Sequence, residues 1–88
     1  MKYFYVYVLL SLKDNEMYTG YTADLRARMR YHEDGQVPST KNRRPFQLVY
    51  FEGCLNQQDA TRREKYLKSG NGKIYLRSRL SHFFNPTG

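Results

Sequence analysis

The sequence predicts a single α+β domain in which a three-stranded antiparallel sheet is flanked by about three helices. Three observations support this fold class. The 88 residues leave room for only one small core. Three short runs rich in β-branched and aromatic residues have the composition of strands, and three other segments have the capping residues or apolar faces of helices. We assign residues 1–84 to this domain and residues 85–88 to a C-terminal tail.

The first two strands are expected to form a hairpin. Residues 3–10 are aromatic, β-branched or leucine, and they are apolar on both faces, which is typical of a central strand. Residues 13–15 supply a turn, and residues 17–21 follow as a second short strand. A hairpin connection makes these two strands antiparallel.

The first helix is expected directly after the hairpin. Thr22 is predicted to cap this helix, with Asp24 in its first turn, and Gly35 is predicted to stop it after about Asp34. The next segment, residues 36–44, is polar and basic, and its composition indicates an exposed loop.

The second half of the chain predicts one strand and two helices. Residues 46–51 form the third strand. A helix capped by Asn56 or Gln57 is expected to run to about Ser69, and a last helix is expected after residues 70–72. The expected apolar face of the last helix consists of Leu76, Leu80, Phe83 and Phe84.

The charge of the chain indicates a polyanionic partner. The formal net charge is +7 and the isoelectric point is near 9.7, so the surface attracts phosphate backbones. The only cysteine, Cys54, excludes an intramolecular disulfide and fits a reducing cytoplasm. No apolar run approaches the roughly 20 residues that span a bilayer, so we expect no membrane partner.

Glu64 is the first candidate for a functional side chain. It lies four residues after Ala60 and three before Leu67, on or beside the apolar stripe of its helix. It is also the only acid among residues 61–79. A partly buried carboxylate needs a cationic partner, because an unpaired buried charge is costly. The partner is either a basic side chain in a salt bridge or a metal ion.

Arg28 and His32 form the second candidate, because residues four apart share one helix face. An arginine matches phosphate oxygens with a planar fork, and a positioned histidine can move a proton or bind an anion. The alternative is a solvated helix face. Tyrosines in the neighbouring strands, among them Tyr7 and Tyr18, are equally open to a purely structural role.

The order of these residues resembles the GIY-YIG nuclease family, especially its small stand-alone bacterial members, which are related to the N-terminal nuclease domain of the excision-repair endonuclease. The resemblance spans nearly the whole chain. It is carried by Tyr5-Val6-Tyr7, by Tyr18-Thr19-Gly20, by residues 21–28 with His32 at R-x-x-x-H spacing, and by residues 39–45 and 60–68. Tyr5, Val6 and Thr19 depart from the two motifs, but the tyrosine hydroxyls and Gly20 remain.

The resemblance implies a DNA endonuclease of repair, recombination or processing that hydrolyses a phosphodiester by a one-metal mechanism. It implies that Glu64 holds one Mg²⁺ or Mn²⁺ and that Arg28 contacts the scissile phosphate. It also implies that Tyr7 or Tyr18 takes the proton from the attacking water, while His32 relays that proton or holds the phosphate. The residues expected to contact DNA are Gly20, Thr40, Lys41, Arg43, Arg44, Lys68 and Lys73.

Two other functions stay open at this point. One is a catalytically weak or silent domain that keeps the fold and the basic surface and only binds nucleic acid. The other is a protein-interaction module without metal dependence.

A nuclease this small has no obvious sequence-reading element, so single-stranded or structured DNA is a better expected substrate than a long specific duplex site. A protein partner that directs the nuclease to its DNA is a further expected source of specificity.

Overall fold

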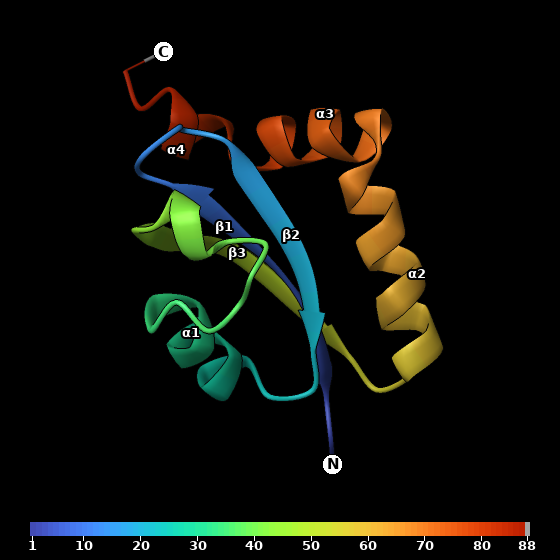
Figure 1. Cartoon of the computed structure of the whole chain (residues 1–88). Coiled ribbons are helices and arrows are strands. Elements are labelled where there is room, and N and C mark those ends of the chain that lie inside the picture. Colours follow the sequence, from blue (N-terminus) through green and yellow to red (C-terminus); the bar gives the residue numbers. More distant parts are fainter. Residues whose placement is uncertain (88) are drawn as a thin grey trace.

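The central layer of the structure, a computed structural model that describes residues 1–87, is a three-stranded sheet (Figure 1). Its strands are β1 (Phe4–Ser11), β2 (Met17–Thr22) and β3 (Phe46–Cys54), and they pair antiparallel in the order β2-β1-β3. The predicted α+β class and three-stranded antiparallel sheet are therefore confirmed. The apolar first strand is central, as predicted, and it buries Val6, Tyr7, Val8 and Leu9.

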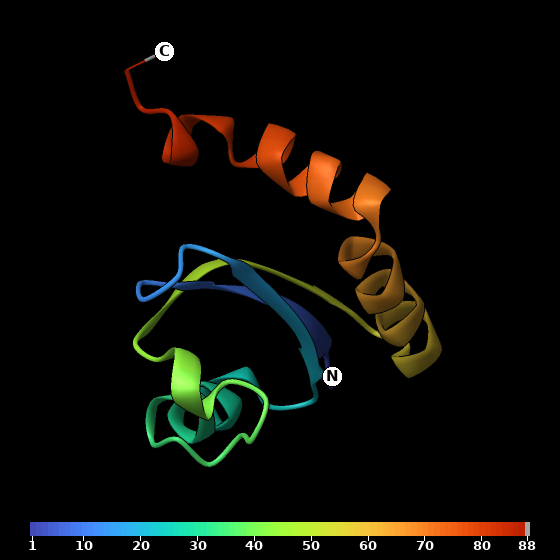
Figure 2. The same ribbon diagram turned by 45° about the horizontal axis from the view of Figure 1, so that its top comes forward.

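Helices cover both faces of this sheet (Figure 2). On one side lie α2 (Gln57–Lys68) and α3 (Gly70–Arg79), which is followed by the short α4 (Ser81–Phe84). On the other side lie α1 (Leu25–Glu33) and the 3-10 turn η1 (Lys41–Arg43). The core under α2 consists of Val6, Val8, Ala60, Leu67 and Leu76. The buried side chains on the α1 side include Tyr7, Leu9, His32, Val37 and Thr40.

The start of α1 differs from the prediction. Thr22 does not cap the helix, because it is still paired with Tyr5 at the end of β2. The N-cap is Asp24, whose Oδ1 accepts a hydrogen bond of 3.1 Å from the amide of Ala27. The extended backbone of Asp24 brings its carboxylate to the free amides of the first turn. The predicted stop is confirmed, since Gly35 follows the helix with a φ of 74°.

The loop of residues 36–44 is less exposed than its composition indicated. Val37 and Thr40 are buried, and η1 forms within the loop. The exposed-loop prediction was wrong at these two positions because the segment folds inward against His32, where Thr40 finds a hydrogen-bond partner. The loop therefore contributes to the interior on the α1 side of the sheet.

The last helix starts earlier and ends earlier than predicted. The hydroxyl of Ser69 accepts a hydrogen bond of 3.1 Å from the amide of Gly72, so residues 70–72 form the first turn of α3 and not a break. The helix ends at Arg79, and Phe83 lies in the separate α4 with 44% of its surface exposed. The four predicted apolar residues therefore do not share one helix face. Within residues 1–87, no helix has the length and apolar content needed to cross a membrane.

Candidate active site

Tyr7, in the middle of β1, is the centre of the candidate site. Its ring crosses the neighbouring strand at Gly20, which is its partner in the β1–β2 register. A Cβ atom added to Gly20 would lie 2.3 Å from the hydroxyl oxygen of Tyr7. Glycine is therefore needed here because a side chain would occupy the space of the tyrosine.

Gly20→Ala is expected to destabilise the protein by roughly 1 to 3 kcal/mol, the usual cost of an added methyl group in a packed site. The methyl group would force the buried ring of Tyr7 out of its position. Gly70→Ala is the matched control, because no described atom lies within 4 Å of a Cβ added there. Urea unfolding measures both variants, and a Gly20→Ala protein as stable as the wild type would contradict this close contact.

A buried hydrogen-bond network holds Tyr7 in place. Its hydroxyl oxygen lies 2.7 Å from Nε2 of His32, and Nδ1 of the same ring lies 2.8 Å from Oγ1 of Thr40. Thr40 donates its own proton to the carbonyl oxygen of Val37 at 3.4 Å, so its oxygen accepts the Nδ1 proton. This assignment leaves Nε2 of His32 without a proton, and Nε2 accepts the hydrogen bond from Tyr7.

His32 is buried and neutral at physiological pH. Only 2% of its surface is exposed, so the interpretation as a solvated helix face is wrong for this residue. Burial, followed by the charge of Arg28, lowers the pKa of His32 from 6.5 to about 4. A buried, neutral imidazole is better suited to passing a proton than to direct contact with a phosphate.

The free energy of unfolding is expected to decrease as the pH falls from 6.5 towards 4. The pKa of His32 is about 4 in the folded protein and 6.5 in the unfolded chain, so between these values the unfolded state binds more protons. The loss is expected to reach roughly 2 to 3 kcal/mol, at about 1.4 kcal/mol for each pKa unit. Urea unfolding at several pH values checks this, with His32→Gln as the comparison. An equal pH dependence in both proteins would assign the effect to other groups.

Arg28 links the two tyrosines predicted for the site. Its Nε donates a hydrogen bond of 3.3 Å to the hydroxyl of Tyr7, and this bond, together with the charges of Tyr7 and Tyr18, raises the pKa of Arg28. The ring of Tyr18 packs against His32 with 5.4 Å between ring centroids, and its hydroxyl accepts a bond of 3.4 Å from Ser39. Burial raises the pKa of Tyr7, and the bond from Arg28 offsets part of this rise.

Glu64 approaches the same tyrosine from α2. Its neighbours on the helix face, Ala60 and Leu67, are buried, which confirms the predicted position beside the apolar stripe. Its side chain is 20% exposed, and its Oε2 lies 3.1 Å from Nζ of Lys68. The charge of Glu64 is the smallest of the causes that raise the pKa of Tyr7. Its cationic partner in the structure is a lysine of its own helix.

A metal ion at this site would have one carboxylate as its protein ligand. Within the part of the chain that the structure describes, no three His, Cys, Asp or Glu side chains gather in one place. A single carboxylate nevertheless fits Mg²⁺, which keeps several of its waters and commonly uses one or two carboxylates. Glu64 fits this requirement because its side chain is partly exposed and a hydrated ion can reach it.

The basic loop residues that were expected to contact DNA have different surroundings. Arg43 donates from Nε to Oδ2 of Asp14 at 2.9 Å and holds the pKa of that carboxyl at about 2. Thr40 is buried against His32. Both side chains therefore hold the loop against the rest of the domain, and neither contact was evident from the sequence.

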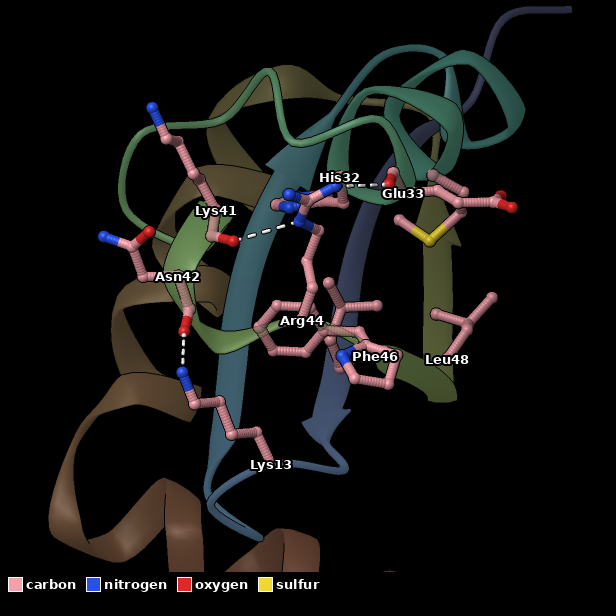
Figure 3. Close-up of a pocket in the computed structure, with 11 residues that line it drawn as sticks. Lys13, His32, Glu33, Lys41, Asn42, Arg44, Phe46 and Leu48 are labelled. Carbon is pink, nitrogen blue, oxygen red and sulfur yellow. Dashed lines mark hydrogen bonds between the residues drawn. The ribbon is translucent and has the colours of Figure 1, made fainter.

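Arg44 and Lys41 lie around a pocket of about 810 Å³ that is also lined by His32 (Figure 3). Arg44 donates hydrogen bonds of 3.0 Å to the main-chain carbonyl oxygens of Glu33 and Lys41, which ties the loop to the end of α1. The side chain of Lys41 is exposed. Of these two residues, Lys41 has the position better suited to an external anion.

Lys68 and Lys73 lie close to the candidate active site. Together with Tyr18 they line a hollow of about 200 Å³ between β2, α2 and α3. The pairing of Lys68 with Glu64 was missed in the sequence, although the spacing of four residues on one helix is the signal that could have found it. The structure thus joins Tyr7, Tyr18, Arg28 and His32 by direct contacts. Glu64 is connected to them through Lys68, which lines a hollow with Tyr18 and Lys73, while Arg43 is engaged elsewhere.

Comparisons with known proteins identify the family of the chain and agree with its fold. Residues 3–80 match the family described as the GIY-YIG catalytic domain. The UPF0213 protein CPE1444 of Clostridium perfringens is 41% identical over 80 residues, which cover 88% of this chain and 85% of that protein. A UPF0213 protein of Pediococcus pentosaceus is 48% identical over 66 residues, or 74% of this chain and 68% of that protein. The solution structure of the UPF0213 protein BH0048 from Bacillus halodurans has a TM-score of 0.54 and 37% identity, and covers 86% of this chain and 83% of that one.

Proposed function

Because the chain belongs to the GIY-YIG catalytic domain family, which is a family of nucleases, we propose that it is an endonuclease that hydrolyses a phosphodiester bond of DNA with the help of one divalent metal ion. The observation that best supports this proposal is the hydrogen bond between Arg28 and Tyr7, with Glu64 paired to Lys68 in the hollow that Tyr18 also lines. Behind them lies the buried pair of His32 and Thr40. A domain that only binds DNA needs surface cations but has no need of this buried network.

In the proposed reaction the oxygen of Tyr7 takes a proton from the attacking water while its own proton passes to Nε2 of His32. The 2.7 Å distance between the two atoms gives the proton a path. In the free protein His32 is a weak acceptor, because burial and Arg28 lower its pKa to about 4. A phosphate bound at Arg28 would offset the positive charge of this residue and so raise the pKa of His32. His32 is therefore a better proton acceptor when the substrate is present. Tyr18 instead faces the hydroxyl of Ser39, which is a much poorer proton acceptor.

Arg28 and Glu64 stabilise charge in this mechanism. The guanidinium of Arg28 is already oriented by its bond to Tyr7, and the rest of its fork contacts the scissile phosphate as the phosphorus becomes five-coordinate. Glu64 would hold Mg²⁺ or Mn²⁺, and such an ion, when bound, stabilises the charge on the leaving 3′ oxygen. Each of the three side chains thus acts on a different oxygen of the reacting group.

The proposed substrate is single-stranded or structured DNA in the cytoplasm. The candidate site lies at a sheet edge, and the exposed Lys41, Lys68 and Lys73 offer positive charge for a phosphate backbone. These lysines do not form a helix face or ribbon suited to reading bases in a major groove. A protein partner that directs the nuclease to its DNA is compatible with so small a domain.

The products of the reaction test the proposed function. Attack by water with loss of the 3′ oxygen leaves a 3′-hydroxyl and a 5′-phosphate, and it places one solvent oxygen in the phosphate. Labelled DNA incubated with the protein and Mg²⁺ or Mn²⁺ in ¹⁸O water should show both features by gel and mass spectrometry. Salt-sensitive binding without products would favour the silent DNA-binding alternative, and a stable protein–DNA adduct would identify a tyrosine as the nucleophile.

A further inference from the structure

Lys68 forms an ion pair with Glu64, the residue proposed to hold the metal ion. Its Nζ lies 3.1 Å from Oε2 of the carboxylate, one turn further along α2. The side chain of Lys68 is 53% exposed, whereas that of Glu64 is 20% exposed. The lysine can therefore leave without disturbing the core, while the carboxylate stays in position.

We propose that Lys68 competes with the metal ion for Glu64 and moves to a DNA phosphate when the metal binds, so that metal and DNA bind cooperatively. This inference rests on the proposed metal role of Glu64. An ion pair of this spacing on a helix surface is weak and easily exchanged. A divalent cation on the same carboxylate would repel the ammonium group of Lys68. The displaced ammonium group would then be free to bind another anion.

The hollow beside Tyr18 offers a place for that anion. It has a volume of about 200 Å³, and its two charged lining residues are Lys68 and Lys73. Its other walls come from residues of β2 and from Leu67 and Leu76, so none of its lining side chains is acidic. Because Tyr18 belongs to the candidate active site, a phosphate held here would belong to a nucleotide near the scissile bond. Ammonium groups bind such oxygens through charge-assisted hydrogen bonds.

The competing explanation is that Lys68 only stabilises α2. In that case its removal would leave metal affinity unchanged, because a helix of twelve residues packed on the sheet does not depend on one surface pair. Competition predicts instead that removal of the lysine makes metal binding tighter.

Titration of the DNA-free protein with Mn²⁺, followed by the electron paramagnetic resonance signal of the free ion, separates these two roles. Lys68→Met is expected to bind Mn²⁺ roughly two- to fivefold more tightly than the wild type, as loss of a surface ion pair implies. Lys65→Met is the matched control, since Lys65 is an exposed residue of the same helix and forms none of the ion pairs found within residues 1–87. Its affinity should equal that of the wild type. An unchanged or weaker affinity in Lys68→Met would overturn the competition.

Glu64→Gln separates a failure of this inference from a failure of the proposed function. If this variant binds Mn²⁺ as the wild type does, Glu64 is not the metal ligand. Both the proposed metal role of Glu64 and the competition by Lys68 are then refuted. If it loses Mn²⁺ while Lys68→Met binds Mn²⁺ as the wild type does, the metal role of Glu64 is supported and only the competition by Lys68 is refuted. Circular dichroism confirms that each variant is folded.

The affinity for DNA tests the second half of the proposal. Binding of a labelled single-stranded oligonucleotide is measured by fluorescence anisotropy in EDTA and in Ca²⁺, which also binds carboxylate oxygens. Addition of Ca²⁺ is expected to strengthen binding by the wild type more than binding by Lys68→Met, because cooperative binding is reciprocal. An equal gain in the two proteins would show that Lys68 does not move to the DNA.

Discussion

Glu64→Gln is expected to lower the rate of DNA cleavage by about 10³-fold or more, while the affinity for DNA changes by less than roughly threefold. A metal ion that stabilises the leaving oxygen contributes several kcal/mol to the transition state, and each 1.36 kcal/mol is about tenfold in rate. The contribution to DNA binding is smaller, because that charge develops only as the bond breaks. Single-turnover cleavage and fluorescence anisotropy measure the two quantities.

Asp59→Asn is the matched control for Glu64→Gln. Asp59 also lies on α2 and also pairs with a basic residue of that helix, since its Oδ1 lies 2.9 Å from Nη2 of Arg62. It is exposed and lies in the first turn, away from Tyr7. Cleavage by this variant should remain at the wild-type rate. A Glu64→Gln protein that keeps the wild-type rate would refute the metal role of Glu64.

Tyr7→Phe is the second substitution with a large expected effect, a decrease in cleavage rate of roughly 10² to 10⁴-fold. It removes the oxygen that accepts the proton of water, and it also interrupts the path to His32. The lost hydrogen bonds of the buried network are expected to cost about 1 to 3 kcal/mol of stability. Urea unfolding must therefore accompany the kinetics, so that rates are compared for folded protein only.

Tyr18→Phe is the comparison that assigns the role. Its hydroxyl makes a long bond of 3.4 Å with Ser39 and lies beside Arg28 without a bonded imidazole. We expect its removal to lower the rate by less than about tenfold, below the usual range for a general base. If Tyr18→Phe is much slower than Tyr7→Phe, Tyr18 is the proton acceptor, and the pair of Tyr7 and His32 is structural.

Much of the fold could be predicted because local patterns and tertiary contacts agree. The first strand is apolar on both faces, and it became the buried central strand. The errors lie at helix ends, where several residues compete for one role. Both Thr22 and Asp24 can cap a helix, and the pairing of Thr22 with β1 decides between them. That pairing depends on the whole sheet and is not visible in the local sequence.

The candidate site could be predicted only in part for the same reason. The spacing of Arg28 and His32 places them on one face of a helix, but it does not reveal that His32 is buried between Tyr7 and Thr40. The inward fold of the loop after α1 creates that environment. Nothing in a polar and basic loop indicates which of its hydroxyls will bond a histidine. The pairing of Lys68 with Glu64 could have been predicted, because residues four apart on a helix are neighbours.

The most direct test of the proposed nuclease is a cleavage assay with the purified protein on labelled single-stranded, duplex and branched DNA, in Mg²⁺, Mn²⁺ or EDTA. We expect cleavage of at least one of these substrates with a divalent metal and none in EDTA. DNA that is bound by the protein but stays intact under every condition would contradict the proposed function.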